Sequence, residues 1–179
     1  MADATSADDV ARTFAEAGPV DLVVDAITTN PTSAPLAESP PDALEPMTAL
    51  VTGIFHVLRV AARVLGEQGH GTFVQITGGS SRRGNPGRGA WAASMFATRA
   101  LLQSAAAELR ERNVHAALLI VDGIIESPKT RERGIVGGEP DATVDEAEVA
   151  RAVAYLAAQS PRAWTHELQL TPRLERWVP

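Results

Sequence analysis

One glycine-rich segment of the sequence has the spacing of an anion-binding loop. The pattern Gly84-x-x-Gly87-x-Gly89 stands before a predicted helix and is flanked by Arg82, Arg83 and Arg88. Backbone N–H groups at such a loop, together with a helix N-terminus, can bind an anion. The segment lacks the lysine of a P-loop and does not follow a strand directly. An ordinary surface loop is therefore the preferred interpretation.

Nucleophilic and metal-ligating side chains are not clustered along the chain. Ser80 and Ser81 do not form a G-x-S-x-G arrangement, which argues against a nucleophile elbow. The absence of cysteine excludes disulfides, thiolate chemistry and cysteine zinc sites. The histidines stand apart from one another and form no metal-binding motif, so no metal site is expected: His56, His70, His115 and His166. We interpret His115 as a partly buried structural histidine whose hydrogen-bonding groups have partners.

The predicted elements alternate between helix and strand. A short helix capped by Ser6, with Asp9 three residues on, precedes a valine-rich strand at 20–27. Long helices are predicted at 42–67 and 90–112, with strands at 72–77, 114–121 and 166–170. A last helix is predicted from a capping box of Thr143 and Glu146 to about residue 160, after a long connection over 122–142. This alternation predicts the α/β class, with one domain over 1–179 and a parallel sheet with flanking helices.

Two carboxylates follow the strand predicted at 114–121. Asp122 and Glu126 would lie at its carboxyl end, beside the usual ligand cleft of an open α/β sheet. They are candidate ligand contacts, although an ordinary turn role is the preferred alternative.

Composition restricts the classes of partner. Apolar residues make up 45% and charged residues 21% of the chain, and the net charge is −6. The acidic balance argues against binding nucleic acid or anionic membranes, since both require a basic surface. No uninterrupted apolar run approaches the ~18 residues of a membrane span, and the acidic N-terminus differs from a signal peptide. We therefore expect a soluble, cytoplasmic protein.

Five segments, in order, resemble the short-chain dehydrogenase/reductase family. Residues 21–28 (DLVVDAIT) resemble the family's D-hydrophobic-V-N-N-A-G strand end, and residues 73–78 (FVQITG) resemble its I-V-N-I-S-S strand. Residues 85–95 (NPGRGAWAASM) resemble the stretch that carries Y-x-x-x-K, and residues 120–128 (IVDGIIESP) resemble the P-G-x-x-x-T-P segment. Residues 146–157 resemble the family's last large helix. The resemblance covers nearly the whole chain. It implies the C-terminal two-thirds of a Rossmann-like fold, without the family's first βα units and their glycine-rich nucleotide turn, whether natively or because the start codon was placed late.

The resemblance places none of the family's catalytic residues in this sequence. The catalytic Asn, Ser, Tyr and Lys positions fall at Leu50, Gly78, Trp91 and Met95. In the family the Tyr is the general acid/base, and the Lys lowers its pKa and holds the nicotinamide ribose. Indole has no titratable proton near neutral pH and a thioether carries no charge. The only Tyr and Lys, Tyr155 and Lys129, are far apart and in the wrong order.

Three functional hypotheses remain open. The first is a catalytically degenerate family member that acts by binding or assembly, with no cofactor expected. The second is an atypical NAD(P)-dependent oxidoreductase whose N-terminal nucleotide-binding part is missing from this chain, and the third is a decayed gene product. The cleft would be lined by Thr28, Gly78, Gly79, Trp91, Asp122, Gly123 and Glu126.

The resemblance also implies an oligomer. The family's two long helices, here about 42–67 and 90–112, pack against their copies as a four-helix bundle. The partner would be a second copy or an intact relative, and Leu50, Val51, Ile54, Phe55 and Val60 make the first helix apolar on several sides. We also expect strand 20–27 to form an unprotected sheet edge.

Overall fold

The fold is built on a four-stranded parallel sheet. A computed structural model describes residues 2–30, 33–136 and 138–175. The strands are β1 (Leu22–Asp25), β2 (Thr72–Gly78), β3 (His115–Val121) and β6 (Glu167–Leu170), in the spatial order β1-β2-β3-β6. All three strand pairs are parallel. The predicted α/β class and parallel sheet are confirmed.

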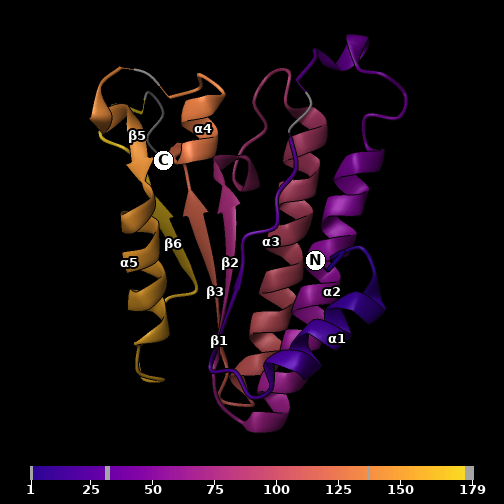
Figure 1. The fold of residues 1–179 in the computed structure, drawn as a ribbon, viewed down its shortest axis with the longest axis vertical. Coiled ribbons are helices and arrows are strands. Elements are labelled where there is room, and N and C mark those ends of the chain that lie inside the picture. The colour runs from indigo at the N-terminus through magenta and orange to yellow at the C-terminus, as the bar shows by residue number, and fades with distance from the viewer. Residues whose placement is uncertain (1, 31–32, 137, 176–179) are drawn as a thin grey trace.

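Helices cover the two faces of this sheet unequally. The helices α1 (Ala7–Ala17), α2 (Glu45–Gln68) and α3 (Gly89–Arg110) lie on one side, and α5 (Glu146–Ala157) lies on the other (Figure 1). The predicted long helices thus form within about three residues of their expected ends. Ser6 caps α1 as predicted, because its side chain accepts a hydrogen bond from the Asp9 N–H.

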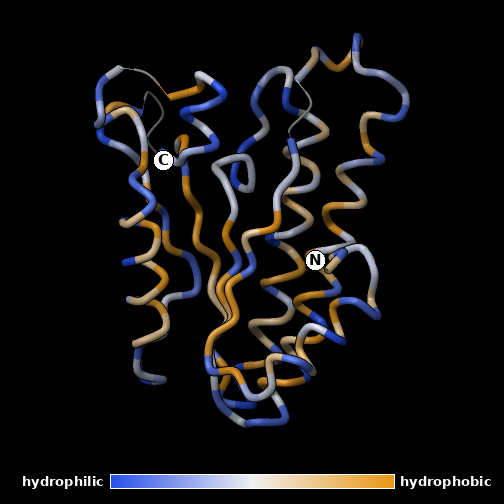
Figure 2. The backbone as a smooth tube through the Cα atoms, viewed as in Figure 1, coloured by the Kyte–Doolittle hydropathy of each residue, from blue (hydrophilic) through white to orange (hydrophobic). Residues whose placement is uncertain are grey.

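The core has two layers, one on each face of the sheet. Figure 2 shows hydrophobic residues concentrated along the central strands and the inner helix sides. Between the sheet and α2/α3, the centre of the layer is Leu58, Leu65, Phe73, Leu102, Leu118 and Ile120. Between the sheet and α5, it is Val74, Leu119, Val121, Val149 and Leu156. The central strand β3 is buried along its whole length, as expected of a strand covered on both faces.

The strand β1 is an edge of the described sheet. Leu22 is 40% and Val24 is 42% exposed, whereas Asp25 at the strand's end is buried. Edge strands with exposed apolar side chains are prone to pair with other strands. The unprotected edge expected from the sequence is therefore present in the described part of the chain.

The connection after β3 contains structure that the sequence pattern did not predict. A second, two-stranded parallel sheet joins β4 (Ile124–Glu126) to β5 (Thr143–Asp145), and the short helix α4 (Pro128–Glu132) lies between them. Short 3-10 turns occupy Leu36–Glu38, Gly79–Ser81 and Pro140–Ala142. The predicted Thr143 cap was wrong. Thr143 belongs to β5 and its hydroxyl donates to Pro140 O, whereas Asp145 caps α5 by accepting from the Ala147 N–H.

His115 has a structural role at the start of β3. Its ring is buried, with Nδ1 3.1 Å from Leu156 O and Nε2 2.9 Å from Thr165 O. The ring also stacks on Trp164. These contacts connect β3 to the end of α5 and to the segment before β6, as the structural interpretation of this histidine predicts.

By length and hydropathy alone, α2 resembles a membrane span, and it is the one described helix that does. Its buried residues nevertheless belong to the core, including Leu58 and Leu65 against the sheet. Core helices of globular proteins often have this composition, so the feature is weak support for a membrane role.

Candidate active site region

A small apolar cavity lies where β1, β2 and β3 end. Its volume is about 270 Å³. It is lined by Ala26, Ile27, Thr28, Ile54, Ile76, Thr77, Gly78, Trp91, Met95, Val121 and Ile125. The hydroxyls of Thr28 and Thr77 and the indole N–H of Trp91 are the polar side-chain groups of these lining residues. The carboxyl ends of parallel strands are where open α/β sheets hold ligands, which makes this cavity the candidate site.

Three of the four positions that the family resemblance assigns to catalysis lie in one hydrophobic cluster. Leu50 and Met95 are buried there with Ile54, and Trp91 and Ile27 pack against them half-buried. Met95 is 4% exposed. The fourth position, Gly78, ends β2 beside them and has no side chain. The cluster contains no group able to transfer a proton.

The hydroxyl of Thr77 is the polar group closest to this cluster. Thr77 is buried and its Oγ1 donates to Met95 Sδ at 3.3 Å. A thioether is a weak acceptor. The bond orients the thioether without giving the site a charge or a titratable group near neutral pH.

The candidate lining residues from the sequence divide into two groups. Thr28, Gly78 and Trp91 line the apolar cavity, whereas Gly79, Asp122, Gly123 and Glu126 do not.

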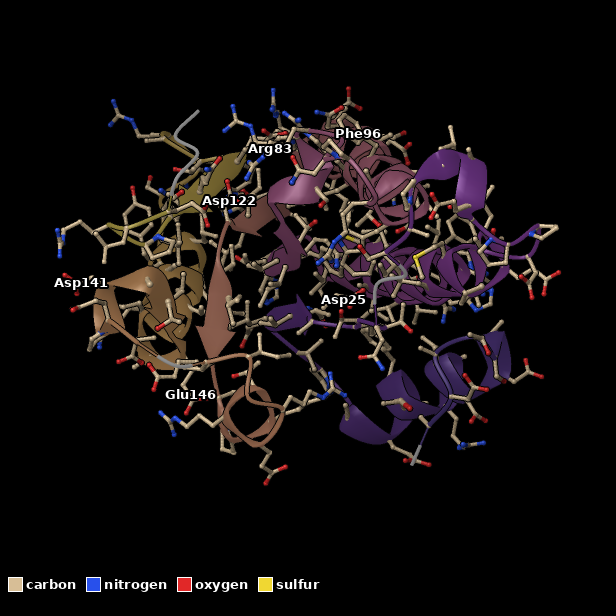
Figure 3. The ribbon with its side chains drawn as sticks, turned by 90° about the horizontal axis from the view of Figure 1, so that it is seen from above. Asp25, Arg83, Phe96, Asp122, Asp141 and Glu146 are labelled. Atoms are coloured by element: carbon tan, nitrogen blue, oxygen red, sulfur yellow. The ribbon has the colours of Figure 1, made fainter. Side chains whose placement is uncertain are left out.

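Figure 3 shows the side chains of Arg83 and Asp122 together, away from Asp25. Asp122 is 4% exposed and accepts two bonds from Arg83, at 2.7 and 2.9 Å. Asp122, in the turn after β3, therefore forms an ion pair inside the protein and is not a contact of the apolar cavity.

The glycines beside Asp122 are required by close packing. A Cβ on Gly79 would stand 2.0 Å from Asp122 Oδ1, and one on Gly123 would stand 2.7 Å from Pro172 Cδ. Glu126 pairs with Arg131 at 2.9 Å and lines a separate, more polar cavity of about 570 Å³. These residues therefore stabilise the strand ends next to the candidate site.

Asp25 is a buried carboxyl at the end of β1 that was not among the candidate site residues expected from the sequence. It ends β1, is 2% exposed, and its Oδ1 accepts from the Ile27 N–H at 2.9 Å. Burial raises the pKa of Asp25 to about 6, and the Ile27 N–H and the Gln75 amide partly oppose this shift. An aspartate within a valine-rich strand was the signal that could have identified it.

The described residues contain no cluster suited to a metal ion. In 2–30, 33–136 and 138–175, no three His, Cys, Asp or Glu side chains are grouped for ligation. Several acidic side chains line the 570 Å³ cavity, where Asp141 pairs with Arg173 at 2.7 Å.

Comparison with known proteins identifies the family. The sequence profile described as short chain dehydrogenase matches residues 1–135, which is most of the chain. This chain is a member of the short-chain dehydrogenase family. No curated protein sequence matches it.

Solved structures of the family share the fold. A short-chain dehydrogenase from Rhodopseudomonas palustris is 26% identical, with a TM-score of 0.76, over 95% of this chain and 72% of that chain. A short chain dehydrogenase/reductase family protein is 28% identical, with a TM-score of 0.76, over 94% of this chain and 73% of that one. An NADPH-bound short chain oxidoreductase from Pseudomonas aeruginosa PAO1, described as containing an atypical catalytic center, is 19% identical with a TM-score of 0.83 over 99% and 76% of the two chains.

The described residues do not fit the nicotinamide dinucleotide that short-chain dehydrogenases use. The candidate cavity, at about 270 Å³, is smaller than the ~300–1,000 Å³ of ordinary ligand pockets. Its lining offers no cation to a phosphate, and Met95 is a buried thioether where the family Lys would hold the ribose. Arg83, the partly buried arginine of the glycine-rich loop, is paired with Asp122.

Proposed function

We propose that this short-chain dehydrogenase family member does not catalyse hydride transfer and acts by binding or assembly. The observation that carries the proposal is the hydrophobic cluster of Leu50, Ile54 and Met95, with Trp91 against it. General acid/base catalysis needs a titratable group within hydrogen-bond reach of the reacting atom. In this chain the positions that would supply the group form part of the core.

The first test of the proposal is dinucleotide binding. We expect titration calorimetry with NAD⁺, NADH, NADP⁺ and NADPH to give no dissociation constant below about 1 mM, because a phosphate gains little without N–H groups or cations directed at it. The variant Trp91→Ala enlarges the cavity, so it tests whether the small size of the cavity is what keeps the dinucleotide out. A low-micromolar dissociation constant for the unmodified chain would contradict the proposal.

A second candidate function is an atypical NAD(P)-dependent oxidoreductase whose nucleotide-binding part lies outside this chain. Two observations favour it. The fold is similar to that of an NADPH-bound oxidoreductase with an atypical catalytic center. The edge strand β1 leaves Leu22 and Val24 exposed, so further strands have a place to pair. Tight dinucleotide binding in the titration would favour this candidate over the first.

We also propose that the chain assembles through α2 and α3, as a homo-oligomer or with an intact relative. Each helix leaves a phenylalanine exposed on its outer side, Phe55 on α2 and Phe96 on α3, both at 44%. A two-fold interface uses the same surface on both subunits, so two such helices from each copy would form a four-helix contact. Exposed aromatic side chains are frequent anchors of protein interfaces.

Phe55→Glu should weaken this assembly. We expect the unmodified chain to scatter light as at least a dimer at micromolar concentration, and the variant to shift towards monomer, because a charge at the centre of an apolar interface loses its hydration. Leu36→Glu is the matched control, since Leu36 is 86% exposed and lies outside both helices. A soluble monomer of the unmodified chain at all concentrations would contradict the assembly proposal.

A further inference from the structure

Two buried oxygen atoms on neighbouring strands lack hydrogen-bond partners. Asp25 on β1 and Gln75 on β2 stand opposite each other in the sheet register, and they are 2% and 1% exposed. Asp25 Oδ2 and Gln75 Oε1 are the buried side-chain atoms without a partner in the described part of the chain. A buried polar atom without a partner destabilises the folded state, so two such atoms on adjacent strands require an explanation.

The remaining bonds of the two side chains fix which atoms are left over. Gln75 Nε2 donates to Asp25 O at 3.3 Å and to Ile76 O at 3.2 Å, which determines the orientation of the amide. Asp25 Oδ1 accepts from the Ile27 N–H at 2.9 Å. Both unsatisfied atoms are therefore acceptors. A single proton on Asp25 Oδ2, donated to Gln75 Oε1, would satisfy both of them.

The surroundings favour the protonated carboxyl. Val23 and Ile27 each lie two residues from Asp25, and they pack against the apolar clusters formed with α2 and α3. The titratable groups of these elements are engaged elsewhere or exposed. On α2, His56 bonds Ala4 O and Arg59 is exposed, and on α3, Arg99 pairs with Glu167. Burial, the largest influence on Asp25, raises its pKa to about 6 and outweighs the hydrogen bonds of Ile27 and Gln75, which lower it; no charged side chain contributes to the shift.

We propose that Asp25 and Gln75 form a proton-sharing pair, in which the protonated Asp25 carboxyl donates from Oδ2 to Gln75 Oε1, and that loss of this proton loosens the end of β1. The pair is a pH-sensitive device in the fold. It acts on the candidate site, because Ala26, Ile27 and Thr28, which follow Asp25 directly, line the apolar cavity. It also acts on the sheet edge, where β1 holds to the sheet through β2.

The test follows the carboxyl and the strand end separately by NMR on the unmodified chain. We expect the ¹³C shift of the Asp25 carboxyl to titrate with a midpoint near pH 6. We also expect the protection of the β1 amides (Leu22–Asp25) from hydrogen exchange, corrected for intrinsic rates, to fall about tenfold from pH 5 to pH 7.5. A two-unit shift gives a ~100-fold change over the whole titration, of which about tenfold falls between pH 5 and pH 7.5 because the rest has occurred by pH 5.

Two variants separate the pair from general pH effects. Asp25→Asn keeps a donor opposite Gln75 Oε1 at every pH, so its β1 amides should show no such loss of protection. Asp42→Asn removes an exposed carboxylate before α2 and should behave as the unmodified chain does. If a water molecule bridged Asp25 Oδ2 and Gln75 Oε1 in place of a shared proton, the Asp25 carboxylate would stay charged. A midpoint below about 4.5, or equal loss of protection in the unmodified chain and Asp25→Asn, would overturn the proposal.

Discussion

Replacing Met95 by lysine should destabilise the protein by about 3 kcal/mol at pH 7, because the ammonium would enter an apolar cluster that contains no counter-charge. Met95 is 4% exposed and belongs to the buried cluster of Leu50 and Ile54, against which Trp91 packs. A buried lysine responds by losing its proton. The free energy of unfolding of the variant should therefore recover as the pH rises towards 10, which chemical denaturation at several pH values measures.

The matched control for this substitution is Met95→Leu, which preserves volume and apolarity. It should cost less than about 1.5 kcal/mol and show no added pH dependence. Thr77 would lose its thioether acceptor in both variants, and the pH dependence found only in the lysine variant reports the charge. A lysine variant as stable as the leucine variant at pH 7 would show that position 95 accommodates a cation, as a catalytic site would.

Asp25→Asn should stabilise the protein by about 3 kcal/mol at pH 7.5. The folded-state pKa of Asp25 is raised from 3.8 to about 6, and two pKa units correspond to about 3 kcal/mol. The folded protein holds this proton more tightly than the unfolded chain does. The contribution of Asp25 to stability is therefore complete below about pH 4, decreases as the pH rises towards 6, and stays lost above that value.

The measurement is urea unfolding of the unmodified chain and Asp25→Asn from pH 4 to pH 8. The difference between the two should be small at pH 4 and should reach its full size by pH 7, because only the unmodified chain loses stability over this range. Other carboxylates cancel in the comparison, including Glu167, where burial raises the pKa but the hydrogen bonds and charge of Arg99 outweigh it and lower the pKa overall. A variant less stable than the unmodified chain at pH 7.5 would show that the carboxylate form is the one that the fold stabilises.

The sheet and its helices were predictable from local patterns. The alternation of valine-rich runs with amphipathic segments placed β1, β2, β3, α2 and α3, because buried strands and helices each require a characteristic periodicity. The pairing of β4 with β5 was not predictable. Each strand has three residues, and the two are held by a long-range contact across α4 that no local pattern encodes.

The candidate site was predictable in part. The resemblance brought Gly78, Trp91 and Met95 to one place, and Trp91 and Thr28 line the cavity as expected of cleft residues. The role of Asp122 was not predictable, because its partner Arg83 comes from a loop 39 residues earlier. The importance of Asp25 depends on its burial between two clusters, which follows from the packing of α2 and α3 onto β1.

Hydride transfer is the activity whose absence defines the proposed function. The most direct measurement uses NADPH and NADH deuterated at C4 of the nicotinamide, with mass spectrometry detecting deuterium in the products of a broad panel of aldehydes and ketones. We predict no incorporation above the protein-free reaction, because the cluster of Leu50, Met95 and Trp91 offers no acid to the carbonyl oxygen. Deuterium incorporation by the unmodified chain, abolished by Trp91→Ala, would contradict the account.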